Sequence, residues 1–184
     1  MAQLIKTAYE IKEWSGGTTT EIFIYPEGAE YDQRNFSFRL STASVEIDET
    51  TFTSLPGVKR TLMVLHGKME LSHEGHHTKM LQEHDVDEFD GGWKTTSKGK
   101  CIDFNLMCKG ETSGKLRGFA IEKNRFKEFK VSGKLNFIYV TGGSITINRK
   151  TYHPGALVRI KLEAIIQLQA KEHCDFIVAE IFNP

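Results

Sequence analysis

The chain has 184 residues, of which 39% are hydrophobic and 26% charged, and its formal net charge is zero. Such a composition is typical of a soluble protein with one large core or two small ones, and nothing in the net charge draws the chain to nucleic acid or to an anionic membrane. No apolar run approaches the roughly 20 residues that cross a bilayer, and the N-terminus lacks the apolar core of a signal peptide. We therefore expect a cytoplasmic protein with neither a nucleic-acid nor a membrane partner.

The first distinctive segment is Trp14-Ser15-Gly16-Gly17-Thr18-Thr19-Thr20-Glu21. Two adjacent glycines allow backbone dihedrals that other residues avoid. An aromatic residue before such a turn can wall a cavity, and the hydroxyls and carboxylate that follow can orient a ligand. A glycine turn closed by a packed tryptophan is an equally good interpretation.

Short segments with strand patterning follow one another along the whole chain. Residues 36–41 and 102–106 alternate apolar and polar side chains with a period of 2, which is typical of strands. Further extended segments are 21–25, 61–65, 68–72, 135–140, 144–148, 156–160, 164–170 and 176–182. Turn residues separate nearly all of them, and no 12-residue segment has a helical stripe. The sequence predicts an all-β chain, either a sandwich or a barrel.

Two stretches, 63–71 and 139–147, repeat one pattern: an apolar strand, a turn ending in glycine, and an alternating strand. In the second copy, Pro154-Gly155 precedes another apolar strand, and this turn resembles one that recurs in cupin barrels. The repeat predicts a bicupin, with two antiparallel β-sandwich or barrel units packed together. The loop-like composition of 109–114 divides them into residues 1–112 and 113–184.

Histidine spacing gives little support to a metal site. Many cupins bind metal through Gly-x5-His-x-His, and here Gly67 is followed after five residues by His73, but Gly75 stands where the second histidine is needed. No properly spaced carboxylate follows, and Arg149 stands at the first ligand position of the second copy. We therefore predict no metal and no cofactor. We expect the histidines of this region to lie on a solvated hairpin and its loop: His73, His76, His77 and His84.

The three cysteines of the chain have no close pair in the sequence. We expect them to be small buried hydrophobic residues: Cys101, Cys108 and Cys174.

Two strand faces carry short polar residues where exposed faces elsewhere in the chain carry Lys or Glu. One face holds Ser37, Arg39, Ser41 and Ala43, and the other holds Asp103, Asn105 and Met107. If these faces point inward, Arg39 and Asp103 are buried charges and must pair with each other or with a ligand. The alternative is that water covers both faces.

Several segments in the first two thirds of the chain resemble, in the right order, the signature of the HutD/Ves family. They are Trp14-Ser15-Gly16-Gly17 with Thr19 and Glu21, Phe38-Arg39-Leu40-Ser41-Thr42-Ala43, Leu55-Pro56-Gly57-Val58-Lys59-Arg60-Thr61-Leu62, Phe89-Asp90-Gly91-Gly92-Trp93, and Asp103-Phe104-Asn105-Leu106-Met107. The resemblance implies a bicupin whose shared residues gather in the N-terminal barrel. Members associated with histidine utilisation are thought to handle or sense a small acidic intermediate, and the family has no established catalytic residue.

The matched residues define a candidate ligand site. It comprises Trp14, Ser15, Thr19, Glu21, Arg39, Ser41, Arg60, Asp90, Trp93, Asp103 and Asn105. Arg39 and Arg60 offer planar donors suited to a carboxylate, although pairing with acidic side chains of the chain explains them equally well. For Asp90, which precedes two glycines, capping of a turn is the preferred role over that of a general base.

The site and the resemblance together predict two alternative functions. In the first, the N-terminal barrel binds a small carboxylated metabolite in a regulatory or accessory role, and the resemblance implies an intermediate of histidine utilisation such as formylglutamate or urocanate. In the second, the protein is a metal-free hydrolase or isomerase that uses Glu21, Asp90 or Asp103 as acid and base. The sequence does not distinguish a monomer from a homodimer.

Overall fold

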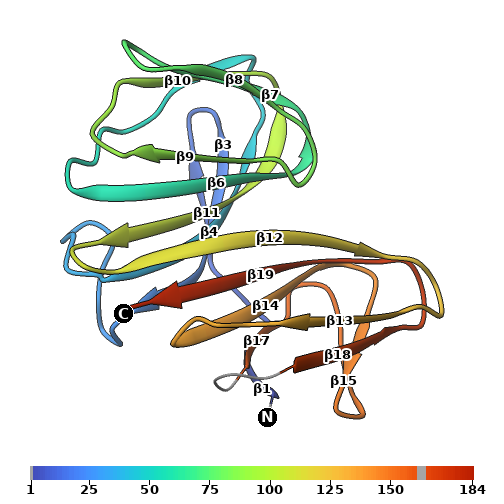
Figure 1. Ribbon diagram of the computed structural model, residues 1–184. Coiled ribbons are helices and arrows are strands. Elements are labelled where there is room, and N and C mark those ends of the chain that lie inside the picture. The colour runs from blue at the N-terminus through green and yellow to red at the C-terminus, as the bar shows by residue number, and fades with distance from the viewer. Residues whose placement is uncertain (1, 161–164) are drawn as a thin grey trace. The chain divides into compact units, whose positions relative to one another are not determined.

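The computed structural model describes residues 2–160 and 165–184 (Figure 1). The regular structure within these residues consists of β-strands, so the prediction of an all-β chain is confirmed. Residue 164, the first of the predicted strand 164–170, lies outside them. Among the described residues, no helix has the length and hydropathy needed to span a membrane.

The N-terminal unit, Tyr9–Ser113, contains two antiparallel sheets that face each other (Figure 1). The strands of the six-stranded sheet are, in spatial order, β2 (Ile11–Trp14), β3 (Gly17–Tyr25), β4 (Phe38–Val45), β11 (Cys101–Lys109), β6 (Val58–Gly67) and β9 (Val86–Asp90). Those of the four-stranded sheet are β5 (Glu49–Thr51), β10 (Thr95–Lys98), β7 (Met69–His73) and β8 (Thr78–Leu81).

The C-terminal unit contains the described residues of Met1–Ala8 and Gly114–Pro184 and has the same two-sheet architecture. The five-stranded sheet runs in the order β1 (Ala2–Lys6), β17 (Leu157–Ile160), β14 (Leu135–Gly142), β19 (Cys174–Phe182) and β12 (Ser113–Ile121). The four-stranded sheet runs in the order β13 (Phe126–Lys130), β18 (Ile165–Ala170), β15 (Ile145–Ile147) and β16 (Lys150–Tyr152). The sequence-based division placed the N-terminal segment in the first unit, whereas β1 pairs with β17 of the second. Local patterning could not show this pairing, because its two strands are far apart in the chain.

The apolar core of each unit lies between its sheets. In the N-terminal unit, Leu62 and Val64 of β6 pack in one cluster with Met69 and Leu71 of β7. This is the arrangement expected when the inner faces of two sheets interdigitate. All three cysteines are buried free thiols, as expected, and burial raises the pKa of each to about 12.

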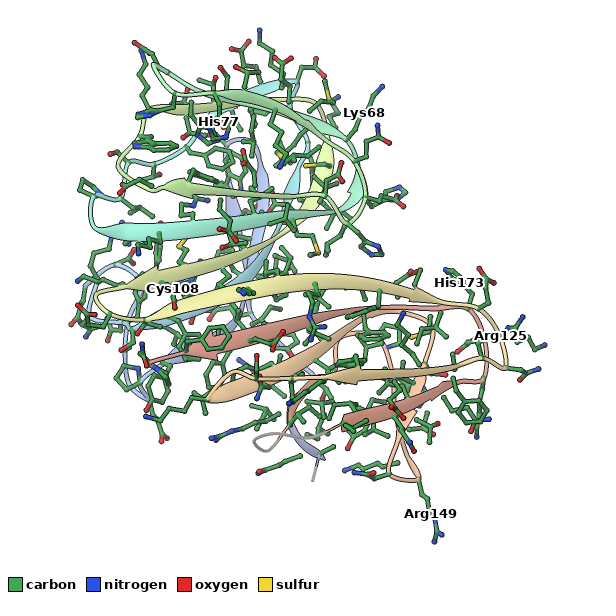
Figure 2. All side chains as sticks on the ribbon, viewed as in Figure 1. Lys68, His77, Cys108, Arg125, Arg149 and His173 are labelled. Atoms are coloured by element: carbon green, nitrogen blue, oxygen red, sulfur yellow. The ribbon has the colours of Figure 1, made fainter. Side chains whose placement is uncertain are left out.

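The two copies of the sequence repeat occupy equivalent places. In each unit the chain leaves the larger sheet, turns at a glycine and enters the smaller sheet, along β6 and β7 in one unit and β14 and β15 in the other. Both turn glycines, Gly67 and Gly143, have positive φ and approach another backbone segment closely. Arg149, which stands at the metal-ligand position of the second copy, lies at the tip of the β15–β16 hairpin (Figure 2).

Candidate functional site

Part of the inner face of the six-stranded sheet is polar. Both β4 and β6 pair with β11, and this register places Arg39 and Arg60 opposite Met107, one on each side. Further along the same strands, Ser41 lies opposite Asn105. Directly opposed residues on neighbouring strands share a face of a sheet. The two arginines therefore belong to the face that carries the apolar core, and both are buried.

Arg39 is held by partners within the protein. Its Nε donates to Glu21 at 2.8 Å, and Nη1 donates to the Ser41 hydroxyl at 2.9 Å. Tyr31 adds a ring contact, 4.5 Å from the guanidinium carbon to the ring centroid. The Glu21 side chain is 39% exposed, so this ion pair lies at the edge of the buried region.

Arg60 is buried to a similar degree but forms fewer hydrogen bonds within the described residues. Its Nη2 donates to the Asn105 side-chain oxygen at 2.9 Å, and its guanidinium lies over the rings of Phe52 and Phe89, at 4.7 Å and 5.2 Å from their centroids. Within the described residues, Nε of Arg60 has no hydrogen-bond partner although the residue is only 7% exposed. Burial lowers the pKa of Arg60 to about 10, despite opposing effects of Asp103 and Tyr31, so the side chain remains charged at neutral pH.

Asp103 is the buried acid of this cluster. Its carboxylate accepts a hydrogen bond from the Asn105 amide. Burial raises its pKa from 3.8 to about 7, while Arg60 and the bond from Asn105 act in the opposite direction. The possible pairing of Arg39 with Asp103 is not formed, because Arg39 turns toward Glu21 and Asp103 is joined to Arg60 only through Asn105.

The two arginines differ in how their charge is balanced. Arg39 forms an ion pair with Glu21, whereas no ion pair of Arg60 is formed within the described residues, and burial raises the pKa of the nearby Asp103 carboxyl, which disfavours its charged form. A buried charge without a full counter-charge is costly. An anion placed beside Arg60 would remove that cost.

The other sequence-predicted residues lie around this cluster or away from it. Ser15 is exposed in the glycine turn, and Trp14, 37% exposed, packs against Gly16 of the same turn, which is the structural role considered for it. Asp90 is exposed and accepts the backbone N–H of Gly92 at 2.7 Å, so the preferred prediction of a turn cap is confirmed. Thr19 is half-buried and lies opposite Ala43, in the same cross-strand row as Asp103, whereas Trp93 packs against the apolar core.

Three aromatic residues that the sequence analysis missed surround the arginines. Phe89 lies opposite Arg60 in the β6–β9 register. It precedes Asp90 in one of the family motifs, so the sequence could have indicated it as a site residue. Phe52 and Tyr31 come from connecting segments outside the paired rows. Such segments carry no periodicity, so the sequence held no comparable signal for them.

A second polar group in this unit corrects the expectation of a solvated histidine hairpin. His73 ends β7 and is only 2% exposed. Its Nε2 lies 3.1 Å from Asp87, and Nε2 of His77 lies 3.0 Å from the same carboxylate oxygen. The expectation failed because alternation along β7 turns His73 inward, toward a partner on a different sheet. His76 remains exposed and stacks on Trp93.

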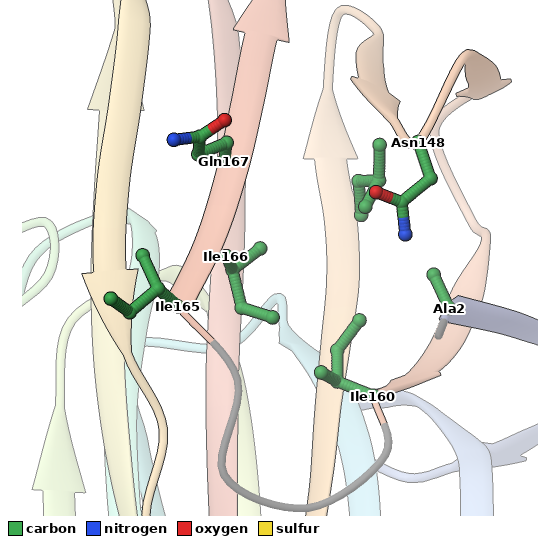
Figure 3. Close-up of a pocket in the computed structure, with 7 residues that line it drawn as sticks. Ala2, Asn148, Ile160, Ile165, Ile166 and Gln167 are labelled. Carbon is green, nitrogen blue, oxygen red and sulfur yellow. The ribbon is translucent and has the colours of Figure 1, made fainter.

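A cavity of about 230 Å³ lies in the C-terminal unit (Figure 3). Its walls are mainly aliphatic, from residues such as Ile160 and Ile166, and its polar groups come from Asn148 and Gln167. Among the described residues, no ionisable side chain lines it. The described lining therefore offers no charged group to bind a carboxylate, and the arginine cluster is the better candidate site.

Several solved structures share the fold of this chain. A conserved protein of unknown function from Pseudomonas aeruginosa PAO1 is 19% identical over 100% of both chains, with a TM-score of 0.81. HutD from Pseudomonas fluorescens SBW25 is 19% identical over 99% of this chain and 98% of that one, with a TM-score of 0.74. The bacterial pirin YhhW from Escherichia coli, solved in complex with nickel(II), is 12% identical over 98% of both chains, with a TM-score of 0.71.

At these identities the likenesses concern the fold, and they confirm the predicted bicupin architecture. No curated protein matches the chain. The model of the HutD family matches residues 6–179, which is nearly the whole chain. The protein therefore belongs to the HutD family, as the resemblance of its N-terminal motifs indicated.

Proposed function

We propose that the N-terminal unit binds a small carboxylated metabolite at Arg60 and serves a regulatory or accessory role. The observation that carries the proposal is the state of Arg60: the side chain is 7% exposed and charged, and its Nε has no acceptor within the described part of the chain. A carboxylate matches the planar fork of a guanidinium and would supply both the acceptor and the counter-charge.

The surroundings of Arg60 favour a small ligand with a flat or short carbon skeleton. Phe52 and Phe89 lie against the guanidinium, and Tyr31 covers the neighbouring Arg39. Aromatic walls with a few fixed polar groups are typical of small-molecule sites. Urocanate and formylglutamate meet these requirements, and both belong to the histidine-utilisation chemistry with which members of the family are associated.

Calorimetric titration with urocanate and with formylglutamate tests the proposal. Arg60→Ala should weaken binding by about 2 to 3 kcal/mol, which is the cost of losing a charge-assisted contact. Arg60→Lys should recover part of the loss, since it keeps the charge without the fork. Arg149→Ala, at an exposed hairpin tip in the other unit, is the matched control. Equal affinities of wild type and Arg60→Ala for every carboxylate tested would remove Arg60 from the site.

Binding should also take up protons near neutral pH. A carboxylate beside Arg60 repels the ionised form of Asp103, whose pKa is already raised to about 7, and raises it further. Affinity should therefore increase as the pH falls from 8 to 6, and titrations in buffers of different ionisation enthalpy should reveal the uptake. In Asp103→Asn this part of the pH dependence should vanish. Its persistence in that variant would assign the proton to another group.

The second candidate function is catalysis, and one observation favours it. A buried carboxyl whose pKa lies near 7 is suited to general acid–base chemistry, and Asp103 is such a group. Glu21 is engaged by Arg39 and Asp90 caps a turn, so they are weaker candidates. Turnover of urocanate or formylglutamate by wild type, abolished in Asp103→Asn while the ligand still binds, would identify an enzyme. Binding without turnover would leave the accessory role.

A further inference from the structure

The second polar group of the N-terminal unit joins its two sheets. His73 belongs to β7 of the four-stranded sheet, Asp87 belongs to β9 of the six-stranded sheet, and His77 lies in the turn before β8. Figure 2 shows His77 beside the four-stranded sheet. His73 and Asp87 are 2% and 5% exposed, so an imidazole and a carboxylate share a nearly dry environment. The His77 side chain is 40% exposed and leaves one side open to solvent.

Three ligand atoms converge at one point in this group. Nε2 of His73 and Nε2 of His77 lie 3.1 Å and 3.0 Å from the same Asp87 oxygen, and one ligand atom from each residue lies within 4.8 Å of the others. Donors bound at 2.0 to 2.2 Å around a tetrahedral ion are separated by about 3.3 Å, so small shifts would bring these atoms to coordination distance. Two histidines and one carboxylate with an open position form a common donor set for first-row metals.

The hydrogen bonds around His73 favour metal coordination by its Nε2, because they place the proton of the neutral ring on Nδ1. Its Nδ1 lies 2.8 Å from the Thr95 hydroxyl, which itself donates to the Trp93 carbonyl at 3.3 Å. A hydroxyl has one proton, so a Thr95 that donates to Trp93 must accept from Nδ1–H of His73. In a neutral ring, the lone pair of Nε2 then faces the Asp87 oxygen. A cation between these atoms makes that arrangement favourable, and a fixed Nδ1–H donor is the usual support of a metal-bound histidine.

We propose that His73, His77 and Asp87 bind one first-row divalent transition-metal ion, such as Zn(II), and that the ion joins the two sheets of the N-terminal unit. Two nitrogen donors disfavour Mg²⁺ and Ca²⁺, which take oxygen ligands. Further support comes from the Glu88 backbone N–H, which donates to the second oxygen of Asp87 at 3.1 Å and holds the carboxylate in place. The ring of Phe89 contacts both His73 and Arg60, so the metal site adjoins the arginine cluster but shares no ligand with it.

The test uses the full-length chain freed of any histidine tag and dialysed against a chelator. Calorimetry with zinc chloride should give one equivalent bound, and Co(II) should produce visible absorption bands of low-coordinate cobalt with nitrogen ligands. Bound Zn(II) should also raise the melting temperature, because it binds the native state. His77→Ala should weaken Zn(II) binding at least tenfold, and since His77 is partly exposed the variant should still fold. Asp87→Asn provides a second ligand variant.

The control variants separate this site from others. His66→Ala changes a histidine that is exposed and paired with Glu83, and it should leave Zn(II) affinity unchanged. Arg60→Ala should also retain Zn(II) binding, so failure of the proposed carboxylate site and failure of the metal site are distinguishable. Thr95→Val should lower affinity by about 10- to 100-fold with unchanged stoichiometry, as loss of a supporting hydrogen bond does. Equal Zn(II) affinity in wild type, His77→Ala and Asp87→Asn would overturn the proposal and leave a hydrogen-bonded network.

Discussion

Replacing Asp103 by Asn should make the stability of the N-terminal unit less dependent on pH. The carboxyl is 2% exposed, and burial raises its pKa from 3.8 to about 7. Between these values the folded chain holds a proton that the unfolded chain releases. The stability linked to this group is therefore fully present below the ordinary pKa and is lost as the pH rises through 7. Asparagine keeps an oxygen that can accept from the Asn105 amide but has no charge to bury.

The size of the effect follows from the two pKa values. Each pH unit between them corresponds to about 1.4 kcal/mol, so a rise in the pKa of Asp103 from 3.8 to about 7 corresponds to about 4 kcal/mol in all. Between pH 5 and pH 8, where unfolding is readily measured, wild type should lose about 2 to 3 kcal/mol of unfolding free energy through this group, and the variant should show no such loss. Because Asp103 is almost completely buried, screening by water reduces this value little.

Urea denaturation at pH 5 and pH 8, followed by tryptophan fluorescence, measures the effect. Both tryptophans of the chain, Trp14 and Trp93, lie in the N-terminal unit, so the signal reports on the unit that contains Asp103. Asp90→Asn is the matched control, since Asp90 is an exposed turn cap and its variant should follow wild type. If wild type and Asp103→Asn lost equal free energy between the two pH values, the carboxyl of Asp103 would not be titrating as a buried acid.

Two further predictions concern the C-terminal unit and the turns. Both Gly143 and Gly28 have positive φ, but a Cβ at Gly143 would lie 2.0 Å from the backbone oxygen of His173 whereas one at Gly28 meets no atom within 4 Å. Gly143→Ala should therefore lower the melting temperature several degrees more than Gly28→Ala, and equal losses would show that φ alone sets the cost. Arg117→Ala removes a 2.9 Å ion pair from buried Glu180 and should lower the free energy of unfolding by about 1 to 3 kcal/mol, measured by chemical denaturation. An unchanged stability would show that hydration of the remaining carboxylate replaces the arginine.

The candidate site was partly predictable because strand alternation groups side chains by face. Residues two apart on a strand share a face, so Arg39 was expected beside Ser41, and Asp103 beside Asn105. The pattern could not show which face would be buried, since short polar residues suit either environment. It also could not pair the charges: Arg39 binds Glu21 on β3, while Arg60 reaches Asp103 only through Asn105.

Sequence alone determined the all-β class, the repeated hairpins with their turn glycines, and which polar residues share a strand face. These features depend on the alternation of neighbouring side chains and on the conformational freedom of glycine. Only the tertiary structure decided that β1 joins the C-terminal unit, that His73 turns inward toward Asp87, and that Tyr31 covers an arginine. These contacts join residues on different strands or loops. Such contacts depend on the register between strands far apart in the chain and on which sheet faces become buried. A local sequence pattern shows neither the register nor the buried face.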